Sequence, residues 1–439
     1  MESSKRRKFY LSIKTKFIIS HAAAIIWTIL SIYLSLPWVM DLGQFVTVSV
    51  SAAIIAGIAY VPGYMNAFMV VSLLLDRQPP LAVELPDDPL TILIACRNEE
   101  KSIGSTLAYV RKQNYAGPLH IIVIDNGSSD RTADAAVEAG EQLGLRVDVM
   151  RVERPGKHYA LNEALKRVET PLIVTLDADT LLHPYALSHI VARYHTSPDT
   201  VCAVAGAVLV RNSRYNLVTR VQEWDYFLGI ASIKRLQGLF QGTLVAQGAF
   251  SLYKTDAVRA IGGWPDAIGE DIVLTWRMLG NGWNVYFEPL SVAFTDVPNT
   301  LKHFVRQRSR WARGMIEALK LIKPWSQPIP FVKYLTGVNL VMPFIDSVYT
   351  FCWLPGLIMA MFGYYWVAGP MTLLVLPLAM LQNYILYRYQ KKVFRSLQLR
   401  IRKNRFAFVL YVLFYQMIMS PVSVLGYLQE TFKLKRVWK

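Results

Sequence analysis

Long apolar runs near both ends constrain the fold of this chain more than any other feature. Residues 17–40 are mostly apolar and follow a cluster of basic residues, and residues 45–75 form a second run. About 20 apolar residues suffice for a helix to cross a bilayer. The first run is longer than a signal-peptide core and lacks a clear small-residue cleavage site, so we predict a retained span. The second run predicts a single helix that is tilted or kinked at Pro62.

The composition is that of a chain only partly in water. Of its 439 residues, 53% are hydrophobic and 18% are charged, whereas soluble domains average about a quarter charged residues. The formal charge of +16 favours an anionic partner: nucleic acid, a phosphate-bearing substrate or the inner face of a bilayer. Because Cys96, Cys202 and Cys352 lie far apart, neither a disulfide framework nor a cysteine metal site is supported. We expect a reduced, cytosolic soluble part.

The C-terminal part predicts further spans. Apolar runs cover residues 335–367, 371–387 and 406–428, and the segment 388–405 contains eight basic residues and no acid. The positive-inside rule places this segment in the cytosol, on the side of the basic N-terminus and of the polar middle region. Basic residues flank the last apolar run on both sides. That run therefore either crosses the membrane or is re-entrant around Pro421.

The middle region, from about residue 76 to 323, alternates short apolar runs with helical patterns. Strands are predicted at residues 90–96, 121–125, 146–152 and 172–177, and helices at 100–113 and 133–143. Such alternation predicts a mostly parallel sheet with helices on both faces. Ligands of such sheets bind beyond the carboxyl ends of the strands, and polar side chains follow three of the predicted strands.

Three of the candidate ligand-binding segments lie at or near these strand ends. Asp177 and Asp179 can face one crevice, where paired carboxylates beside a bound diphosphate suit Mg²⁺ or Mn²⁺; the alternative is a solvated acidic turn. Asp125 can accept hydrogen bonds from a nucleobase or ribose, although residues 126–130 also form an ordinary helix-capping turn. Lys157, in a loop before a helix, can reach a diphosphate or be a plain surface lysine.

Two further motifs lie on predicted helices. Glu270 and Asp271 open a helix, where acids are common for dipole reasons alone; a catalytic interpretation makes Asp271 the general base for an acceptor hydroxyl. The i, i+3, i+4 spacing puts Gln307, Arg310 and Trp311 on one helix face. This face offers an amide, a phosphate-binding guanidinium and a ring on which a sugar can stack. A basic amphipathic helix on the membrane surface is the compatible alternative, which Lys302, Arg306, Arg308 and Arg313 also support.

Taken in chain order, these motifs resemble the Asp, Asp-x-Asp, Glu-Asp and Gln-x-x-Arg-Trp pattern of membrane-integrated family 2 glycosyltransferases. The chain is most similar to bacterial poly-β-1,6-N-acetylglucosamine synthases, with hyaluronan, chitin-oligosaccharide and cellulose synthases as relatives. The resemblance implies an α/β GT-A (Rossmann-like) cytosolic domain inserted between transmembrane helices. It also implies a UDP-sugar donor, Mg²⁺ or Mn²⁺, and processive, inverting elongation and export of a β-linked polysaccharide across the plasma (inner) membrane.

The resemblance also implies roles by position. The nucleotide-sugar would be bound by Asp125, Lys157, Asp177, Gln307 and Arg310. The metal would be bound by Asp179 together with Asp177. Asp271, beside Glu270, would be catalytic. Trp311, Gln247 and Gly248 would meet the acceptor. Gln247 is larger than the residues that relatives place there, and Gly269 and Asn126 also depart from the usual pattern, which leaves the acceptor and the linkage open.

The expected organisation has four parts. Residues 1–75 hold two transmembrane helices, 76–300 the GT-A domain, 301–334 the amphipathic interface helices, and 335–439 the C-terminal spans with a basic cytosolic loop at 388–405. The expected partners are the growing polysaccharide, the bilayer, and a small membrane subunit or second copy, since five spans are few for a channel. Nucleic acid is not expected, because the positive charge concentrates beside the spans.

Two rival functions remain open at this point. A non-processive transferase that adds one sugar to a lipid would use the same donor site. The other is a transporter or receptor that only senses UDP-sugar; such a protein would need neither a general base at Asp271 nor a stacking surface at Trp311.

Overall fold

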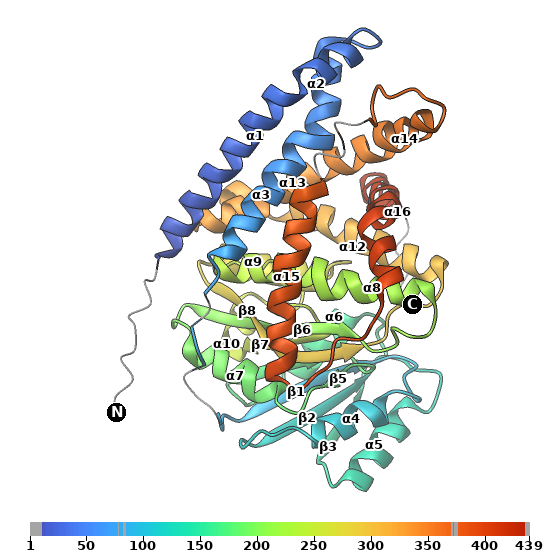
Figure 1. Cartoon of the computed structure of the whole chain (residues 1–439). Helices are drawn as coiled ribbons and strands as arrows, with labels where there is room; N and C mark the ends of the chain where they lie inside the picture. The colour runs from blue at the N-terminus through green and yellow to red at the C-terminus, as the bar shows by residue number, and fades with distance from the viewer. Residues whose placement is uncertain (1–10, 78, 82–84, 370–371, 373–375, 435–439) are drawn as a thin grey trace. The chain divides into compact units, whose positions relative to one another are not determined.

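The computed structural model describes residues 11–77, 79–81, 85–369, 372 and 376–434. The chain divides into two compact units (Figure 1). The first unit comprises Met1–Arg77 and Phe351–Leu386, and the second comprises Gln78–Thr350 and Tyr387–Lys439.

The first unit is helical. Its helix α1 (Ile13–Gly43) packs against α2 (Val48–Ile55) and α3 (Val61–Leu74), which the π-helical turn η1 (Ala56–Tyr60) joins into one run. This π-turn lies directly before Pro62, where the sequence predicts a kink, and such turns are a recognised cause of bends. Small hydroxyl groups connect the helices: Ser72 donates to Ser20 over 2.9 Å. The unit also contains η4 (Tyr349–Trp353) in part, α14 (Leu354–Met361) and the start of α15 (Leu376–Ser396).

Four helices among the described residues are long and apolar enough to cross a membrane, which indicates a multi-pass membrane protein. They are Ile13–Gly43, Val48–Leu74, Pro330–Met361 and Arg405–Thr431. The predicted span at residues 371–387 is not among them; its described part lies in α15, whose second half carries four basic side chains. The segment 388–405 is also not all loop, because α15 continues to Ser396.

An eight-stranded mixed sheet forms the centre of the second unit, in the order β3-β2-β1-β4-β7-β6-β8-β5. The first four of these strands are parallel, as predicted, and β6 is parallel to β8, but β7 and β5 are antiparallel to their neighbours. The strands are β1 (Leu90–Cys96), β2 (Leu119–Asp125), β3 (Val147–Arg151), β4 (Leu172–Leu176), β5 (Leu181–Leu182), β6 (Val201–Val210), β7 (Phe250–Lys254) and β8 (Asn284–Thr295).

Burial explains why the central strands are almost wholly apolar. Ile92 and Ile94 of β1 and Val174 of β4 are completely buried, as are Leu107 and Phe250, which pack in the same core. A strand covered on both faces has no polar side. Helices α4 (Ile103–Arg111) and α5 (Thr132–Leu143) pack together beside the β1–β3 end of the sheet (Figure 1). Other helices of this part are α6 (Lys157–Leu165), α7 (Ala186–Thr196) and α10 (Thr255–Ala260).

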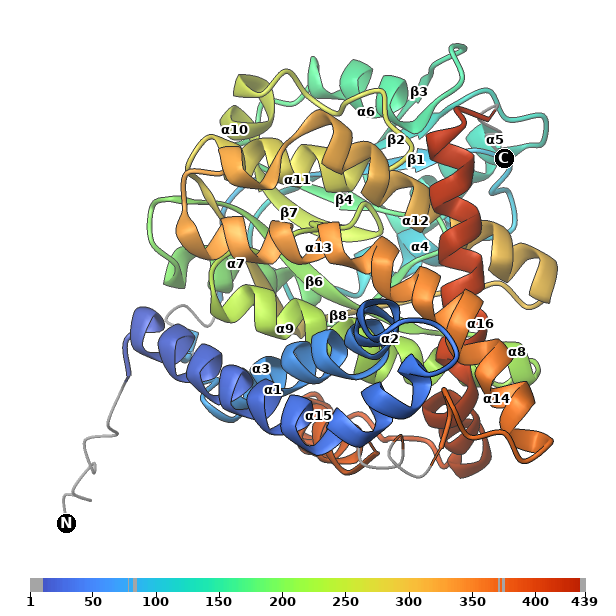
Figure 2. The ribbon, with the colours of Figure 1, turned by 90° about the horizontal axis from the view of Figure 1, so that it is seen from above.

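A second helical layer belongs to the same unit. It contains α8 (Leu217–Trp224), η2 (Asp225–Ile230), α9 (Ala231–Leu239), α11 (Glu270–Gly280), α12 (Leu301–Leu321), η3 (Pro324–Ser326), α13 (Pro330–Val348) and α16 (Arg405–Thr431). Helix α16 lies against both α12 and α13 (Figure 2). Gly426 of α16 faces the Ser309 carbonyl so closely that any side chain there would clash. On α13, the Asp346 carboxylate accepts hydrogen bonds from Ser420 (2.8 Å) and Tyr427 (2.7 Å) of α16.

Candidate active site

The paired aspartates follow β4, at the carboxyl end of the parallel part of the sheet. The Asp179 carboxylate accepts hydrogen bonds from Thr295 (3.1 Å) at the end of β8 and from Thr180 (3.3 Å). The carbonyl between the two acids, that of Ala178, accepts from Thr106 of α4 over 2.7 Å. Burial, and then the neighbouring Asp177, raise the pKa of Asp179 to about 6. The Asp177 carboxylate is therefore close enough to oppose the ionisation of Asp179.

Lys157 is part of this cluster and not a surface side chain. It begins α6 directly after Gly156, whose φ of +135° only glycine adopts readily. Its ammonium donates to the Asp177 carboxylate over 2.5 Å. Burial alone would lower the pKa of Lys157, but Asp177 and the acids at 270–271 outweigh it and raise the pKa. A methyl group added to Gly248 would lie 2.8 Å from the ammonium, so Gly248 keeps this space open.

Glu270 and Asp271 open α11 beside the same lysine. The Asp271 carboxylate accepts a hydrogen bond from the Ile272 N–H of the same helix over 2.9 Å. Burial, and then the adjacent Asp271, raise the pKa of Glu270 to about 7, while Lys157 and Arg310 act in the opposite direction. The carboxylate of Glu270 is thus near both cations. Two acids, a lysine and an arginine from three separate helices meet here.

A close approach of two glycines positions the start of α11 on α12. A methyl group added to Gly314 would lie 3.0 Å from the Gly269 Cα, and one added to Gly269 would lie 3.1 Å from the Gly314 Cα. Next to this contact, the buried Glu317 carboxylate accepts from the Ile268 N–H over 2.6 Å. Gly269, which departs from the usual family pattern, is therefore required by packing in this chain.

The predicted helix at Gln307–Trp311 exists as part of α12. Arg310 and Trp311 are exposed and Gln307 is half-buried, so this face is open for a ligand. The Trp311 ring lies 6.4 Å from that of Tyr226, centroid to centroid. The charge of Arg310 acts on Glu270, as described above, whereas no hydrogen bond among the described residues joins Gln307 to the paired aspartates.

The structure contradicts the membrane-surface interpretation for two arginines of α12, Arg308 and Arg313. Arg308, 3% exposed, forms an ion pair with Asp225 over 2.8 Å, and its guanidinium lies 4.2 Å from the Trp311 ring centroid. Arg313 forms an ion pair with Glu430 over 2.9 Å. Both side chains are buried, so they do not face lipid headgroups. Arg308 is a site residue that sequence reasoning missed; the available signal was Asp225, a single acid in the apolar run 224–230.

The Gln247 side chain is held by residues of β6 and α9. Its Nε2 donates to the Gly206 carbonyl (2.5 Å), and its Oε1 accepts from the ammonium of Lys234, which also donates to the Val245 carbonyl over 2.7 Å. Burial lowers the pKa of Lys234 to about 7, with Asp271 acting in the opposite direction. Sequence reasoning missed Lys234 altogether, because nothing in its helical context marks it.

Asp125 ends β2, next to β1 in the sheet, and is buried. Its carboxylate accepts from the Ser128 N–H over 3.0 Å, which is the capping-turn geometry. Asn98, with a left-handed φ of 59°, accepts from Ser129 and so holds this loop against the end of β1. Burial, and then the charges of Glu99, Asp125 and Asp177, raise the pKa of the nearby Cys96 thiol. Asp125 therefore lies at the same carboxyl edge of the sheet as the paired aspartates.

The acids of this crevice suit a divalent cation that a substrate helps to hold. No group of three or more His, Cys, Asp or Glu side chains in the described ranges could hold a metal by itself. Mg²⁺ is usually bound through one or two carboxylates plus substrate phosphates. Asp179, with Asp177 beside it, supplies this minimal set, so the residues fit the cation that the sequence predicts.

Comparisons with known proteins agree with this geometry. The sequence model of the family "Glycosyltransferase like family 2" matches residues 86–314. A poly-beta-1,6-N-acetyl-D-glucosamine synthase of Staphylococcus aureus (strain COL) is 34% identical over 247 residues, 56% of this chain and 58% of that protein. The synthase of Staphylococcus epidermidis is 32% identical over 231 residues, 52% of this chain and 55% of that protein. The matched segment thus spans little more than half of these curated relatives.

Among solved structures, the mannosyltransferase PcManGT from Pyrobaculum calidifontis, in complex with GDP-Man and Mn²⁺, superposes with a TM-score of 0.60. It is 19% identical, and the match covers 88% of this chain and 99% of the mannosyltransferase chain. This likeness confirms the predicted GT-A-like α/β fold flanked by apolar helices.

Proposed function

This chain belongs to glycosyltransferase family 2, and on this premise we propose that it is a processive, inverting transferase of the plasma (inner) membrane with its catalytic domain in the cytosol. Its donor is a UDP-sugar, and UDP-N-acetylglucosamine is the first choice because the curated relatives make poly-β-1,6-N-acetyl-D-glucosamine. Its product is a β-linked polysaccharide that is exported through the membrane helices.

The observation that carries this proposal is the meeting of Asp177, Lys157, Glu270 and Arg310 at the strand ends. Lys157 binds Asp177 directly, and its pKa responds to the Glu270–Asp271 pair. The pKa of Glu270 in turn responds to Arg310. Cations next to acids at the carboxyl edge of a sheet form the environment that a sugar diphosphate and its metal need.

Transfer needs one carboxylate to accept a proton and several cations to stabilise the leaving group. We assign Asp271 as the base that accepts the proton of the acceptor hydroxyl while its oxygen attacks the anomeric carbon and the bond to UDP breaks. A single displacement of this kind inverts the anomeric centre. Lys157 and Arg310 stabilise the charge that develops on the diphosphate, and we assign Asp125 to binding of the uridine.

Asp179 and Asp177 would hold Mg²⁺ or Mn²⁺ together with diphosphate oxygens. Bound there, the cation neutralises charge on the leaving diphosphate. The Mn²⁺ in the complex of the structurally similar mannosyltransferase supports this choice of ion.

The acceptor sugar is expected on the other side of the acids. The Trp311 ring, 37% exposed, offers a flat surface on which a sugar can stack, and Gln307 lies one turn earlier on the same face. Gly248 borders Lys157 and leaves room for the reacting end of the chain. Gln247 holds the loop that carries Gly248, so it acts on the acceptor through the backbone.

The test is transfer by purified protein with a panel of radiolabelled UDP-sugars. Asp271→Asn should abolish transfer and leave UDP binding nearly intact, whereas wild-type turnover in this variant would refute the assignment of the base. The product separates the two remaining functions: a long polymer supports the proposal, and a single-sugar glycolipid supports the non-processive alternative.

A further inference from the structure

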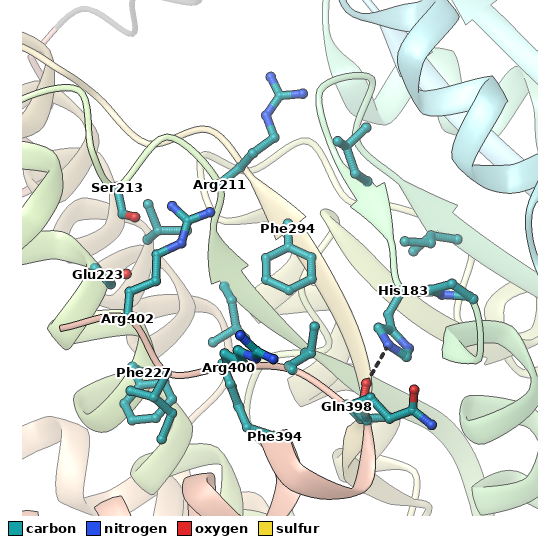
Figure 3. Close-up of a pocket in the computed structure, with 18 of the residues that line it drawn as sticks. His183, Arg211, Ser213, Glu223, Phe227, Phe294, Phe394, Gln398, Arg400 and Arg402 are labelled. Carbon is teal, nitrogen blue, oxygen red and sulfur yellow. Dashed lines mark hydrogen bonds between the residues drawn. The ribbon is translucent and has the colours of Figure 1, made fainter.

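A cavity of about 700 Å³ lies in the second unit, and Figure 3 shows the side chains that line it. Its walls are the ends of β5, β6 and β8, part of α8, and residues 397–402, which lead from α15 to α16. Its volume is typical of a site for a small molecule. None of the proposed catalytic, donor or acceptor residues lines it.

The walls are mostly apolar, with positive charge on one side. Four apolar side chains that face the cavity are Leu209, Phe227, Phe294 and Phe394, and three arginines line it as well: Arg211, Arg400 and Arg402. Figure 3 shows the side chains of Arg400 and Arg402 among the side chains that line the cavity, with Arg400 below Phe294 in this view. An apolar interior with a few converging polar groups is the usual design of a ligand site.

Two of the three guanidinium groups have no acidic partner. Arg211 is neutralised by Asp296, to which its Nε donates over 2.8 Å. Among the described residues, no carboxylate forms an ion pair with Arg400 or Arg402. Glu223 lies on the same wall, but its carboxylate accepts from Asn404 over 2.7 Å. The cavity therefore keeps an excess of positive charge.

The segment that carries these arginines is fixed at both ends. At its start, the Leu397 carbonyl lies 3.2 Å from the His183 Nε2. At its end, the Asn404 carbonyl accepts from the Trp224 indole N–H over 2.9 Å. Residues 398–402 are thus anchored at both ends of the segment beside the cavity. A binding group on a fixed segment loses little entropy when a ligand arrives.

We propose that this cavity binds a phosphate ester whose other end is apolar or aromatic, with the phosphate held by Arg400 and Arg402. Guanidinium groups bind phosphate through charge-assisted, paired hydrogen bonds, and the apolar wall receives the body of the ligand. Two sources supply this chemistry: an anionic phospholipid and a soluble nucleotide. The candidate span α16 begins at Arg405, three residues after Arg402, which is where headgroup phosphates meet basic segments.

The cavity shares a strand end with the donor site. Phe294 lines the cavity, whereas the next residue, Thr295, donates to Asp179. Successive side chains of a strand point to opposite faces, so one strand end contributes to both sites. A ligand in the cavity would therefore fix the position of Thr295 and, through it, of Asp179.

The test measures binding to the purified full-length protein in detergent. One arm uses dioleoylphosphatidylglycerol, followed by native mass spectrometry, and the other uses adenosine monophosphate, followed by calorimetry. The variant is Arg400→Gln with Arg402→Gln, and its matched control is Arg395→Gln with Lys403→Gln. The control pair removes the same charge from exposed positions that flank this segment and do not line the cavity.

We expect at least one ligand to bind, and its affinity to fall about tenfold or more in the cavity pair and less than about twofold in the control pair. Whichever arm binds identifies the source. A Leu399→Trp variant, which keeps every charge but fills the cavity, should weaken the same ligand. Failure of both ligands to bind, or equal losses in the two charge pairs, would overturn the proposal.

Discussion

Replacing Gly314 with alanine should separate the acids of α11 from the motif face of α12. The new methyl group would lie 3.0 Å from the Gly269 Cα and 3.1 Å from its nitrogen, both backbone atoms. Carbon atoms in contact prefer about 3.5–4.0 Å, so the two segments must move apart by about 0.5 Å or more. Glu270 and Asp271 follow Gly269 directly and would move with it.

The expected effects on stability and on rate differ in size. Overpacking costs about 1–3 kcal/mol, but alanine stabilises a helix interior by about 1 kcal/mol relative to glycine. The net loss of unfolding free energy should therefore be about 0–2 kcal/mol. A displacement of about 1 Å near reacting groups can cost about a hundredfold in rate, so we expect kcat to fall between about tenfold and a hundredfold.

The assay is sugar transfer at saturating donor, with UDP affinity and thermal unfolding measured on the same preparation. Gly104→Ala is the matched control, because Gly104 also lies in a helix of this unit and its added methyl group would meet only Ala139 at 3.7 Å. UDP affinity should stay near that of the wild type in both variants. If Gly314→Ala retains wild-type kcat, the contact between the two glycines does not position the catalytic acids.

Three other predictions concern charge. Asp225→Asn leaves the buried Arg308 unpaired and should lower the unfolding free energy by about 3–5 kcal/mol. In thermal melts, a variant that also carries Arg308→Met should recover part of this loss, and no recovery would argue against a stabilising ion pair. Activity should disappear in excess chelator and return with Mg²⁺ or Mn²⁺, and undiminished synthesis in chelator would exclude the metal. Because the raised pKa of Glu270, about 7, keeps it protonated in mild acid, kcat/KM should rise as the pH passes through 7; the same rise in Glu270→Gln would assign it to another group.

The parallel half of the sheet and its acids could be predicted because their signals are local. Apolar runs of strand length separated by helical periods specify β1 to β4, and Asp177 and Asp179 directly follow one of them. The antiparallel β7 could not be predicted in the same way, since its place between β4 and β6 depends on pairing with strands that are distant in the sequence. Local patterns carry no information about such register.

Pairs of distant charges explain why the burial of Arg308 and Arg313 was missed. Arg308 and Arg313 lie in the same basic helix as the exposed Lys302, Arg306 and Arg310, and the residue type alone does not distinguish a buried guanidinium from one in water. Their burial depends on Asp225 and Glu430, which come from other helices. A lone acid inside an apolar run is the one hint that sequence offers, because an unpaired buried carboxylate would be too costly.

Contacts with neighbouring segments fix helix α12 over two turns. These contacts offer a route by which transfer and export could be coupled. Its Gly314 packs against Gly269, which directly precedes Glu270 and Asp271. The Ser309 carbonyl lies against Gly426 of α16, and Arg313 of α12 pairs with Glu430 of α16. Close contacts between backbones resist sliding more than contacts between long side chains do, because backbone atoms cannot change rotamer. A shift of α16, a candidate membrane span, must therefore move α12, and with it Arg310 and Trp311 relative to the acids. The exposed face of α12 that carries Trp311 and the candidate span α16 are in this way mechanically one element.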